Sequence, residues 1–233
     1  MDKMASFKAM LFDLDGTLAD TFPDLLVTLE ESYREAGRLC PNESLSADRL
    51  RPFVSKGARS MVAAASDAEL DPATIDAIHD RFLALYLEGI ARKTRLYAGI
   101  EPLLEWLEGQ GLPWGVVTNK LIDPALRLIG ALGLDKRAAC IVGGDSAARA
   151  KPHPEPMLLA CERISIAPED IVYVGDARTD IEAGRAVGSI TVSAGWGYLD
   201  PADPPSGWGA DIHVDSPREL LERAMRERIA SPA

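Results

Sequence analysis

The chain has few of the features that mark secreted, membrane-spanning or nucleic-acid-binding proteins. Its three cysteines, Cys40, Cys140 and Cys161, are far apart and odd in number. They fit neither a zinc-ligand spacing nor a disulfide framework, so we expect a reducing, cytoplasmic location. No apolar run reaches the roughly 18 residues of a membrane span. Lys and Arg total 25 against 36 Asp and Glu, a net charge of −11, which disfavours nucleic acid as a partner.

The overall composition is that of a globular enzyme. Of the 233 residues, 47% are apolar and 26% are charged, which suits one or two domains. The acidic balance does not exclude a small phosphate as ligand, because a local pocket can be positive. The sequence leaves open whether the chain is a monomer or a homodimer.

Short apolar runs alternate with helical patterns along most of the chain. Near-continuous apolar strands that alternate with helices are typical of a parallel sheet covered on both faces. The expected strands are Ala9–Phe12, Trp114–Val117, Cys140–Val142, Ile171–Val174, Ile190–Val192 and Ile212–Val214. The expected helices are Ile100–Leu107, Pro124–Leu132, Glu155–Ile164, Thr179–Ala186 and Pro217–Arg226, the last capped by Ser216. The pattern predicts an α/β fold with a doubly wound, Rossmann-like parallel sheet.

One stretch interrupts this alternation. No strand signal occurs from about Phe22 to Lys93, where helical patterns cover 24–36, 55–65 and 71–90. Ser55 is the expected N-cap of the second of these helices. We therefore predict an all-helical cap domain, residues 20–95, inserted into an α/β core formed by residues 1–19 and 96–233.

Two aspartates directly follow the first predicted strand. Asp13 and Asp15 are two residues apart, so in an extended strand end they point to the same side. Two such carboxylates repel each other and lose water, which is costly unless a cation or a proton lies between them. A divalent metal beside a nucleophilic carboxylate would satisfy this requirement.

Further polar residues follow the other predicted strands. Thr118 and Asn119 come after the second strand, Lys151 lies in the loop after the third, and Asp176 and Asp180 follow the fourth. Ligands of open α/β sheets bind at the carboxyl ends of the strands. An oxygen nucleophile, a metal and donors to phosphate oxygens are the parts that phosphoryl transfer needs.

Taken together, these segments resemble the haloacid dehalogenase-like superfamily of aspartyl-phosphate enzymes. The matching segments are Asp13-Leu-Asp15-Gly-Thr17, Val117-Thr118-Asn119, Lys151-Pro152 and Gly175-Asp176-Ala-Arg-Thr-Asp180. They occur in the family's order and span essentially the whole chain. The insertion after the first motif is similar to the helical cap of the phosphoglycolate phosphatase-like branch. Three further segments resemble the bacterial N-acetylmuramic acid 6-phosphate phosphatases: Val54–Arg59, Trp114–Asn119, and Gly197–Tyr198 leading to Trp208–Asp211.

The resemblance implies which residues carry the reaction. Asp13 would be the nucleophile that forms an aspartyl-phosphate. Asp15 would be the general acid to the leaving group and then the base for water, and its backbone carbonyl would contact the metal. Asp176 would bind the metal directly. Hard oxygen ligands beside a phosphate suit Mg²⁺ rather than zinc.

The remaining motif residues would bind the phosphate group or support the residues that do. Thr118 and the Asn119 backbone would bind phosphate oxygens, and Lys151 would neutralise charge on the nucleophile and the phosphoryl group. Asp180 would support Lys151 or a metal-bound water. Ala177 stands where some relatives carry a second aspartate, directly after the first.

The cap segment Ser55, Lys56, Gly57 and Arg59 is a candidate for substrate binding. Free N–H groups at a helix start can bind carboxylate or hydroxyl oxygens. The alternative is that this segment only caps its helix.

We therefore expect a Mg²⁺-dependent phosphatase that acts on a small phosphate monoester of the 2-phosphoglycolate or N-acetylmuramic acid 6-phosphate type. One alternative is a sugar phosphomutase, similar to β-phosphoglucomutase, which shares the Asp-x-Asp motif. The other is a non-catalytic metabolite-binding protein on the same fold.

Overall fold

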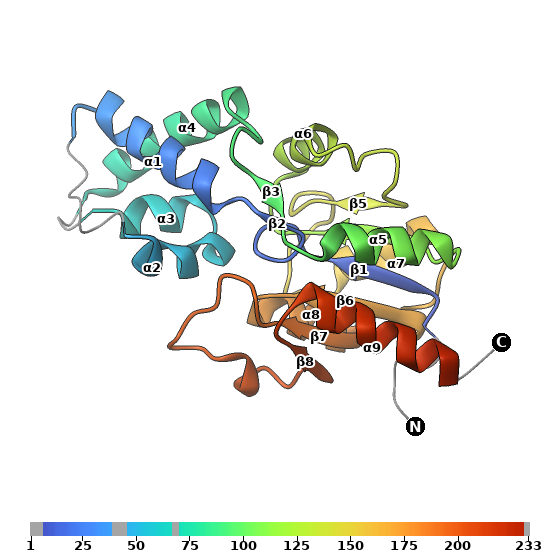
Figure 1. Cartoon of the computed structure of the whole chain (residues 1–233). Coiled ribbons are helices and arrows are strands. Elements are labelled where there is room, and N and C mark those ends of the chain that lie inside the picture. Colours follow the sequence, from blue (N-terminus) through green and yellow to red (C-terminus); the bar gives the residue numbers. More distant parts are fainter. Residues whose placement is uncertain (1–6, 39–45, 67–69, 231–233) are drawn as a thin grey trace.

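The computed structural model describes residues 7–38, 46–66 and 70–230 (Figure 1). Cys40 lies outside the described residues, and Cys140 and Cys161 are buried free thiols. Within the described ranges, no helix is long and apolar enough to cross a membrane.

A parallel sheet forms the centre of the fold. Its order is β5-β4-β1-β6-β7-β8. The strands are β1 (Ala9–Phe12), β4 (Trp114–Val117), β5 (Ile141–Val142), β6 (Ile171–Gly175), β7 (Ile190–Ala194) and β8 (Ile212–Val214). Every pairing in this sheet is parallel, which confirms the predicted doubly wound sheet. The chain reverses its winding between β1 and β6, so a ligand crevice is expected where these two strands end.

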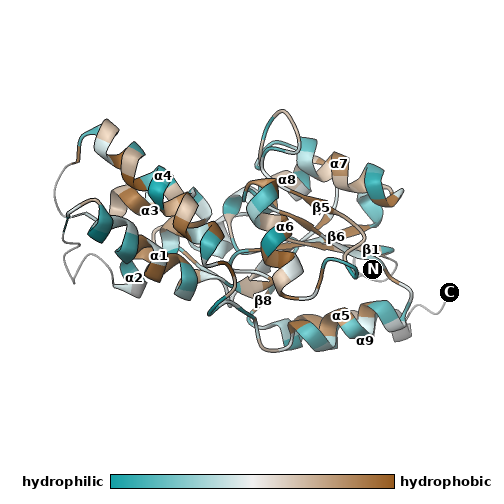
Figure 2. Cartoon of the chain, turned by 90° about the horizontal axis from the view of Figure 1, so that it is seen from above, coloured by the Kyte–Doolittle hydropathy of each residue, from teal (hydrophilic) through white to brown (hydrophobic). Residues whose placement is uncertain are grey.

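Helices cover both faces of the sheet. Strand β1 is buried throughout because its alternate side chains enter two different clusters: Met10 and Phe12 one, Ala9 and Leu11 the other. Figure 2 shows α5 and α9 on one side of the strands and α7 and α8 on the other. The core helices are α5 (Ile100–Gly109), α6 (Ile122–Ala131), α7 (Glu155–Ile164), α8 (Arg178–Ala186) and α9 (Pro217–Ala230). The predicted cap of α9 is confirmed, because the Glu219 N–H donates to Ser216 Oγ over 3.2 Å.

Part of the chain between β1 and β4, from α1 to α4, forms a helical insertion with an apolar cluster (Figure 1). Its elements are α1 (Phe22–Glu35), α2 (Ala47–Leu50), a 3-10 helix (Arg51–Lys56), α3 (Ala58–Ala64) and α4 (Pro72–Glu88). Leu29, Val62 and Phe82 are buried in its cluster. Asp71 caps α4 by accepting a hydrogen bond of 2.9 Å from the Thr74 N–H.

Two local predictions for this region differ from the structure. The helix expected from residue 55 begins later, because Ser55 lies in the 3-10 helix that starts beside Pro52. Gly57, with φ of 89°, is the N-cap of α3 in place of Ser55. The sequence pattern also missed a two-stranded antiparallel ribbon, β2 (Ala19–Asp20) with β3 (Arg95–Leu96), where the chain enters and leaves the insertion. Strands of two residues are too short to show an alternating pattern.

A buried carboxylate fixes the return from the insertion. Asp24, on the first turn of α1, is only 5% exposed. It accepts hydrogen bonds from the Lys93 N–H at 2.9 Å, the Thr94 N–H at 2.8 Å and Thr94 Oγ1 at 2.7 Å. One side chain therefore joins the first turn of α1 to the segment that leads into β3.

We predict that Asp24→Ala lowers the free energy of unfolding by about 2–4 kcal/mol, because buried donors lose their acceptor. Chemical denaturation measures this change. Asp80→Ala is the matched control, because the Asp80 side chain is 83% exposed. Equal stability of the two variants would contradict the assignment.

Candidate active site

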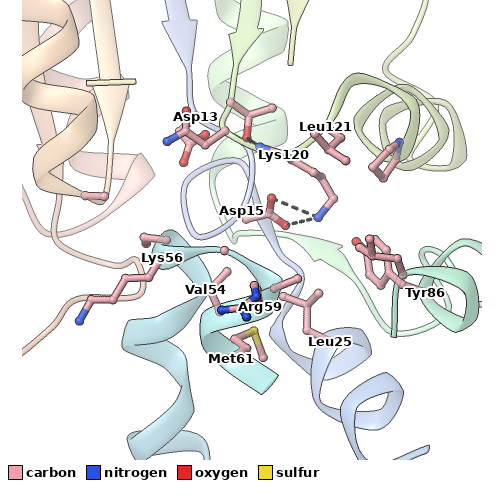
Figure 3. A pocket seen from close by; sticks show the side chains of 18 of the residues that line it. Asp13, Asp15, Leu25, Val54, Lys56, Arg59, Met61, Tyr86, Lys120 and Leu121 are labelled. Carbon is pink, nitrogen blue, oxygen red and sulfur yellow. Dashed lines mark hydrogen bonds and ion pairs between the residues drawn. The ribbon is translucent and has the colours of Figure 1, made fainter. Parts of the chain in front are cut away.

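The motif residues meet at a cavity between the sheet and the helical insertion. The cavity has a volume of about 440 Å³, and its lining includes Asp13, Asp15, Thr118 and Lys151 from the sheet side (Figure 3). The insertion contributes a largely apolar wall that includes Leu25, Met61, Phe82, Leu83 and Tyr86. The arrangement places the motif residues opposite a wall that is largely apolar and also carries Lys56 and Arg59.

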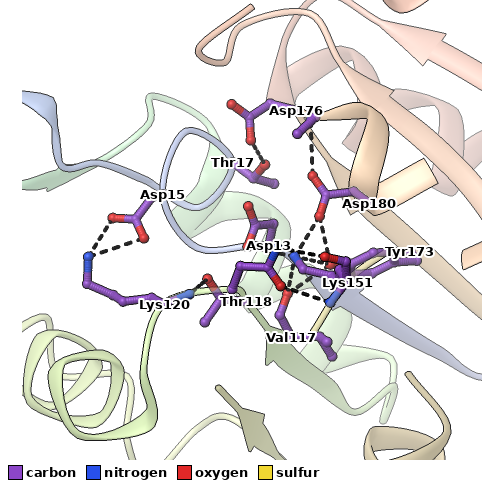
Figure 4. Close-up of polar contacts among 12 residues, drawn as sticks. Asp13, Asp15, Thr17, Val117, Thr118, Lys120, Lys151, Tyr173, Asp176 and Asp180 are labelled. Atoms are coloured by element: carbon purple, nitrogen blue, oxygen red, sulfur yellow. Dashed lines mark hydrogen bonds and ion pairs between the residues drawn. The ribbon is translucent and has the colours of Figure 1, made fainter. Parts of the chain in front are cut away.

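Asp13 and Asp15 emerge together from β1, but their carboxylates face different cations. Lys151 Nζ lies 3.0 Å from Asp13 Oδ1, and Lys120 Nζ lies 3.0 Å from Asp15 Oδ1 (Figure 4). The Thr21 hydroxyl also donates to Asp15 Oδ1 over 2.7 Å. The sequence suggested a single cation or proton between the two carboxylates, whereas each has its own lysine.

Lys151 is buried among acceptors from several strands and one helix. Its ammonium lies 2.6 Å from Asp180 Oδ1, 2.9 Å from the Val117 carbonyl and 2.8 Å from the Tyr173 hydroxyl, in addition to Asp13. Burial alone would lower the pKa of Lys151, but the neighbouring charges of Asp13 and Asp180 raise it above its ordinary value. Lys151 is therefore a fixed positive charge beside Asp13.

Asn119 holds the loop that carries this lysine. Asn119 Nδ2 donates to the Lys151 carbonyl, and the Lys151 N–H donates to Asn119 Oδ1, each over 3.0 Å. The neighbouring Thr118 is buried and lines the cavity. The Asn119 side chain thus aligns two loops, and Asn119 and Thr118 both line the cavity.

Three carboxylates gather at the ends of β1 and β6. Ligand atoms of Asp13, Asp176 and Asp180 all lie within 4.8 Å of one another. Both oxygens of Asp180 are engaged, Oδ1 by Lys151 and Oδ2 by the Ala177 N–H at 3.0 Å. Asp176 also accepts at both oxygens, but from neutral donors, the Thr17 hydroxyl and the Tyr198 N–H. Because Asp180 is paired with the Lys151 ammonium, Asp176, together with Asp13, is better placed to hold a further cation.

The pKa values of Asp13 and Asp176 indicate that this cluster carries more negative charge than Lys151 offsets. Burial raises the pKa of Asp13 to about 6 against the lowering effect of Lys151, and the charges of Asp180 and Asp15 raise it further. Burial and the charges of Asp13 and Asp180 raise the pKa of Asp176 well above its ordinary value. Hard oxygen donors with excess negative charge fit a divalent cation of the magnesium or calcium type.

The cap segment lies at the cavity, but its charged ends have other partners. Ser55, Lys56, Gly57 and Arg59 all belong to the cavity lining. Lys56 Nζ pairs with Asp200 at 2.9 Å, and Arg59 Nε pairs with Asp76 at 2.7 Å. Both basic side chains are at least half exposed. Their contact with a substrate stays a prediction.

Comparison with known proteins agrees with this geometry. Residues 10–194 match the haloacid dehalogenase-like hydrolase family. The chain belongs to this family. It is 43% identical over 220 residues to an N-acetylmuramic acid 6-phosphate phosphatase of Pseudomonas aeruginosa, covering 94% of this chain and 96% of that protein. It is 43% identical over 217 residues to a phosphoglycolate phosphatase of Xanthomonas campestris, covering 93% and 96%.

A solved structure supports the assignment of the fold. The crystal structure of a predicted phosphoglycolate phosphatase from Haemophilus somnus matches with a TM-score of 0.82 and 28% identity, covering 93% of this chain and 97% of that one. The resemblance inferred from the motifs is therefore confirmed, and this haloacid dehalogenase-like hydrolase has named phosphatases as its relatives.

The loop Gly195–Gly209 of this hydrolase also reaches the site, a contribution that sequence reasoning did not assign. The Tyr198 N–H donates to Asp176 Oδ2 over 2.7 Å, and the Trp196 indole N–H donates to the Thr17 carbonyl over 3.0 Å. Thr17 Oγ1 in turn donates to Asp176 Oδ1 over 2.9 Å. A Cβ on Gly16 would clash with Asp176 Oδ2, so the glycine of the Asp-x-Asp-Gly motif is needed for this close approach.

Lys120 is another functional candidate that sequence reasoning missed. It binds Asp15, and its ammonium lies 4.6 Å from the centre of the Tyr86 ring on α4. The signal was present, because Lys120 directly follows the Thr118–Asn119 pair. A single lysine after a strand is, however, more often solvated, and only the fold shows its proximity to Asp15.

We predict that Asp176→Asn melts at a higher temperature than the wild type in chelator at pH 7.5. A carboxyl with a raised folded-state pKa favours the fold when protonated, and this contribution is lost as the pH rises through the folded pKa. An amide avoids that loss and can still hydrogen-bond to Thr17 and Tyr198.

Thermal melting with and without a divalent cation measures this effect. Mg²⁺ should raise the melting temperature of the wild type and have little effect on Asp176→Asn. Asp135→Asn, on an exposed turn, is the control and should respond as the wild type does. A lower melting temperature for Asp176→Asn in chelator would contradict the account of the cluster.

Proposed function

We propose that this chain is a Mg²⁺-dependent phosphatase that hydrolyses small phosphate monoesters through an aspartyl-phosphate on Asp13. The observation that carries the proposal is the position of Asp13, which lies at the cavity beside the buried ammonium of Lys151. A carboxylate that keeps its charge next to a fixed cation can attack phosphorus, while that cation offsets the charge of the phosphoryl group.

In the first step, a carboxylate oxygen of Asp13 bonds to phosphorus and the ester oxygen leaves. Lys151 stabilises the charge on the transferring group, and Thr118 and the Asn119 backbone bind phosphate oxygens. Mg²⁺, held by Asp13, Asp176 and the Asp15 carbonyl, would supply further charge neutralisation. Asp180 keeps Lys151 in place.

We assign proton transfer to Asp15, the second carboxylate at the cavity. It would donate a proton to the departing oxygen and then accept one from the water that hydrolyses the aspartyl-phosphate. These steps release phosphate and regenerate both carboxyl groups. In the structure Asp15 is bound to Lys120 and Thr21, so it must leave Lys120 before it can face the ester oxygen.

The helical insertion would act as a cap. We propose residues 20–95 as the cap domain and residues 1–19 with 96–233 as the core, joined at the β2–β3 ribbon. The cap's wall would exclude water from the reaction. The segment Ser55, Lys56, Gly57 and Arg59 would complete the substrate-binding surface.

The size of the cavity bears on the substrate. A volume of about 440 Å³ is within the usual range for pockets that enclose a whole small molecule. A sugar-sized leaving group would contact both the motif residues and the cap wall, whereas a two-carbon acid would leave most of the wall uncovered. We therefore favour a substrate of the N-acetylmuramic acid 6-phosphate type over 2-phosphoglycolate.

A panel of phosphorylated metabolites tests the proposed activity. The wild type should release phosphate from at least one monoester, lose activity in chelator and regain it with Mg²⁺. Asp13→Asn should lose at least about a thousandfold in kcat/KM. Its melting temperature can differ from that of the wild type, because Asp13 belongs to the carboxylate cluster, which itself affects stability. Circular dichroism would verify that this variant is folded. Activity of Asp13→Asn near that of the wild type would refute the mechanism.

We predict that the loss caused by Asp15→Asn depends on the leaving group. An amide cannot donate the proton that an alkoxide needs, but p-nitrophenolate leaves without it. The loss in kcat should therefore be large for alkyl phosphates and smaller for p-nitrophenyl phosphate. Steady-state kinetics on both esters, with the exposed Asp123→Asn as control, measure the difference. Equal losses would show that Asp15 is not the general acid.

A further inference from the structure

Tyr86 carries a buried hydroxyl group whose oxygen lies near the Lys120 ammonium and whose proton has no acceptor among the described residues. The residue is 3% exposed, lies on α4 and lines the cavity. Its ring stacks on Phe82 with the ring centres 6.2 Å apart, a contact that phenylalanine would make equally well. Because buried polar atoms are rarely left without a partner, this hydroxyl suggests an acceptor that enters from the cavity.

Lys120 lies beside the same hydroxyl-bearing ring. Its ammonium lies over the face of the Tyr86 ring. The same ammonium donates to both oxygens of Asp15, over 3.0 Å and 3.2 Å (Figure 3). A lysine ammonium only donates hydrogen bonds, so it cannot accept the Tyr86 proton. Two donors, one of them charged, therefore lie together on one side of the cavity.

The position of these donors identifies the part of the substrate that they would meet. Asp15 is the proposed proton donor to the ester oxygen, whereas Lys151 and Asp13 lie at the phosphate end. Groups next to Asp15 therefore face the leaving group. The nearby walls are apolar, with Leu25, Phe82 and Leu83 among them, and such surroundings strengthen charge-assisted hydrogen bonds.

We propose that Tyr86 and Lys120 form a subsite for a carboxylate on the leaving group. This inference rests on the proposed phosphatase function. A carboxylate can accept from the phenol with one oxygen and from the ammonium with the other, whereas a neutral hydroxyl cannot replace Asp15 as the counter-charge of Lys120. The bound carboxylate competes with Asp15 for Lys120 and so frees Asp15 to turn toward the ester oxygen. Lys120 is thereby a specificity and positioning residue.

Two matched pairs of esters test the subsite. N-acetylmuramic acid 6-phosphate is compared with N-acetylglucosamine 6-phosphate, which lacks the carboxylate. 2-Phosphoglycolate is compared with 2-hydroxyethyl phosphate, in which a hydroxymethyl group replaces it. The wild type should prefer the carboxylate member of at least one pair in kcat/KM. Tyr86→Phe and Lys120→Met should each reduce that preference about tenfold or more, and Lys120→Arg should restore part of it.

Two controls separate recognition from structure. Tyr33→Phe, in the same apolar cluster, removes a hydroxyl that donates to the Val62 carbonyl over 2.6 Å. It should lower the melting temperature and leave the preference unchanged, whereas Tyr86→Phe should leave the melting temperature of the ligand-free protein unchanged. Lys136→Met removes an exposed charge and should alter neither property.

The outcomes distinguish this inference from the proposed function. If the wild type hydrolyses no phosphate ester, the proposed function fails and the subsite fails with it. If the wild type is active but shows no preference within either pair, or hydrolyses neither carboxylate ester, the subsite alone is overturned. The same holds if Tyr86→Phe, the variant least disturbing to the fold, affects both members of a pair equally.

Discussion

The buried ammonium of Lys151 is the group on which the arrangement of the site depends. It connects Asp13 at the end of β1 with the Val117 carbonyl of β4, the Tyr173 hydroxyl of β6 and Asp180 on α8. An isolated charge in this position would be strongly destabilising, so the surrounding acceptors are required to hold it. The same acceptors fix the strand ends relative to one another. A group that serves the chemistry therefore also organises the edge of the sheet.

The second feature of the site is the separation of its two leading carboxylates. Asp13 faces Lys151 and the carboxylate cluster, whereas Asp15 faces Lys120, Thr21 and the helical insertion. Different surroundings can give two chemically identical groups different roles. Because Lys120 also contacts Tyr86 on α4, the carboxylate proposed for proton transfer is the one whose position depends on the insertion.

Much of this organisation could be predicted from the sequence. Strand β1 was located to the residue, since an apolar run ending in Asp-x-Asp-Gly has few other interpretations, and the order of the motifs predicted which side chains meet. Contacts between distant segments were not predictable. Tyr173 is one aromatic residue in an apolar strand, and Tyr198 belongs to a loop without a periodic pattern, so neither showed its partner in the sequence. The predicted start of α3 was wrong, because a helical pattern cannot distinguish the 3-10 helix before Gly57 from the α-helix that follows it.

The central claim is that phosphorus bonds covalently to Asp13 during turnover. Rapid acid quench of the enzyme with a hydrolysed substrate, followed by borohydride reduction and peptide mapping, tests it directly. Borohydride reduces an aspartyl-phosphate to homoserine and leaves free aspartate unchanged. The account predicts homoserine at position 13 only when substrate and Mg²⁺ are present, with Asp15, Asp176 and Asp180 unmodified. Active turnover with no modification at Asp13, or with modification at another carboxylate, would contradict it.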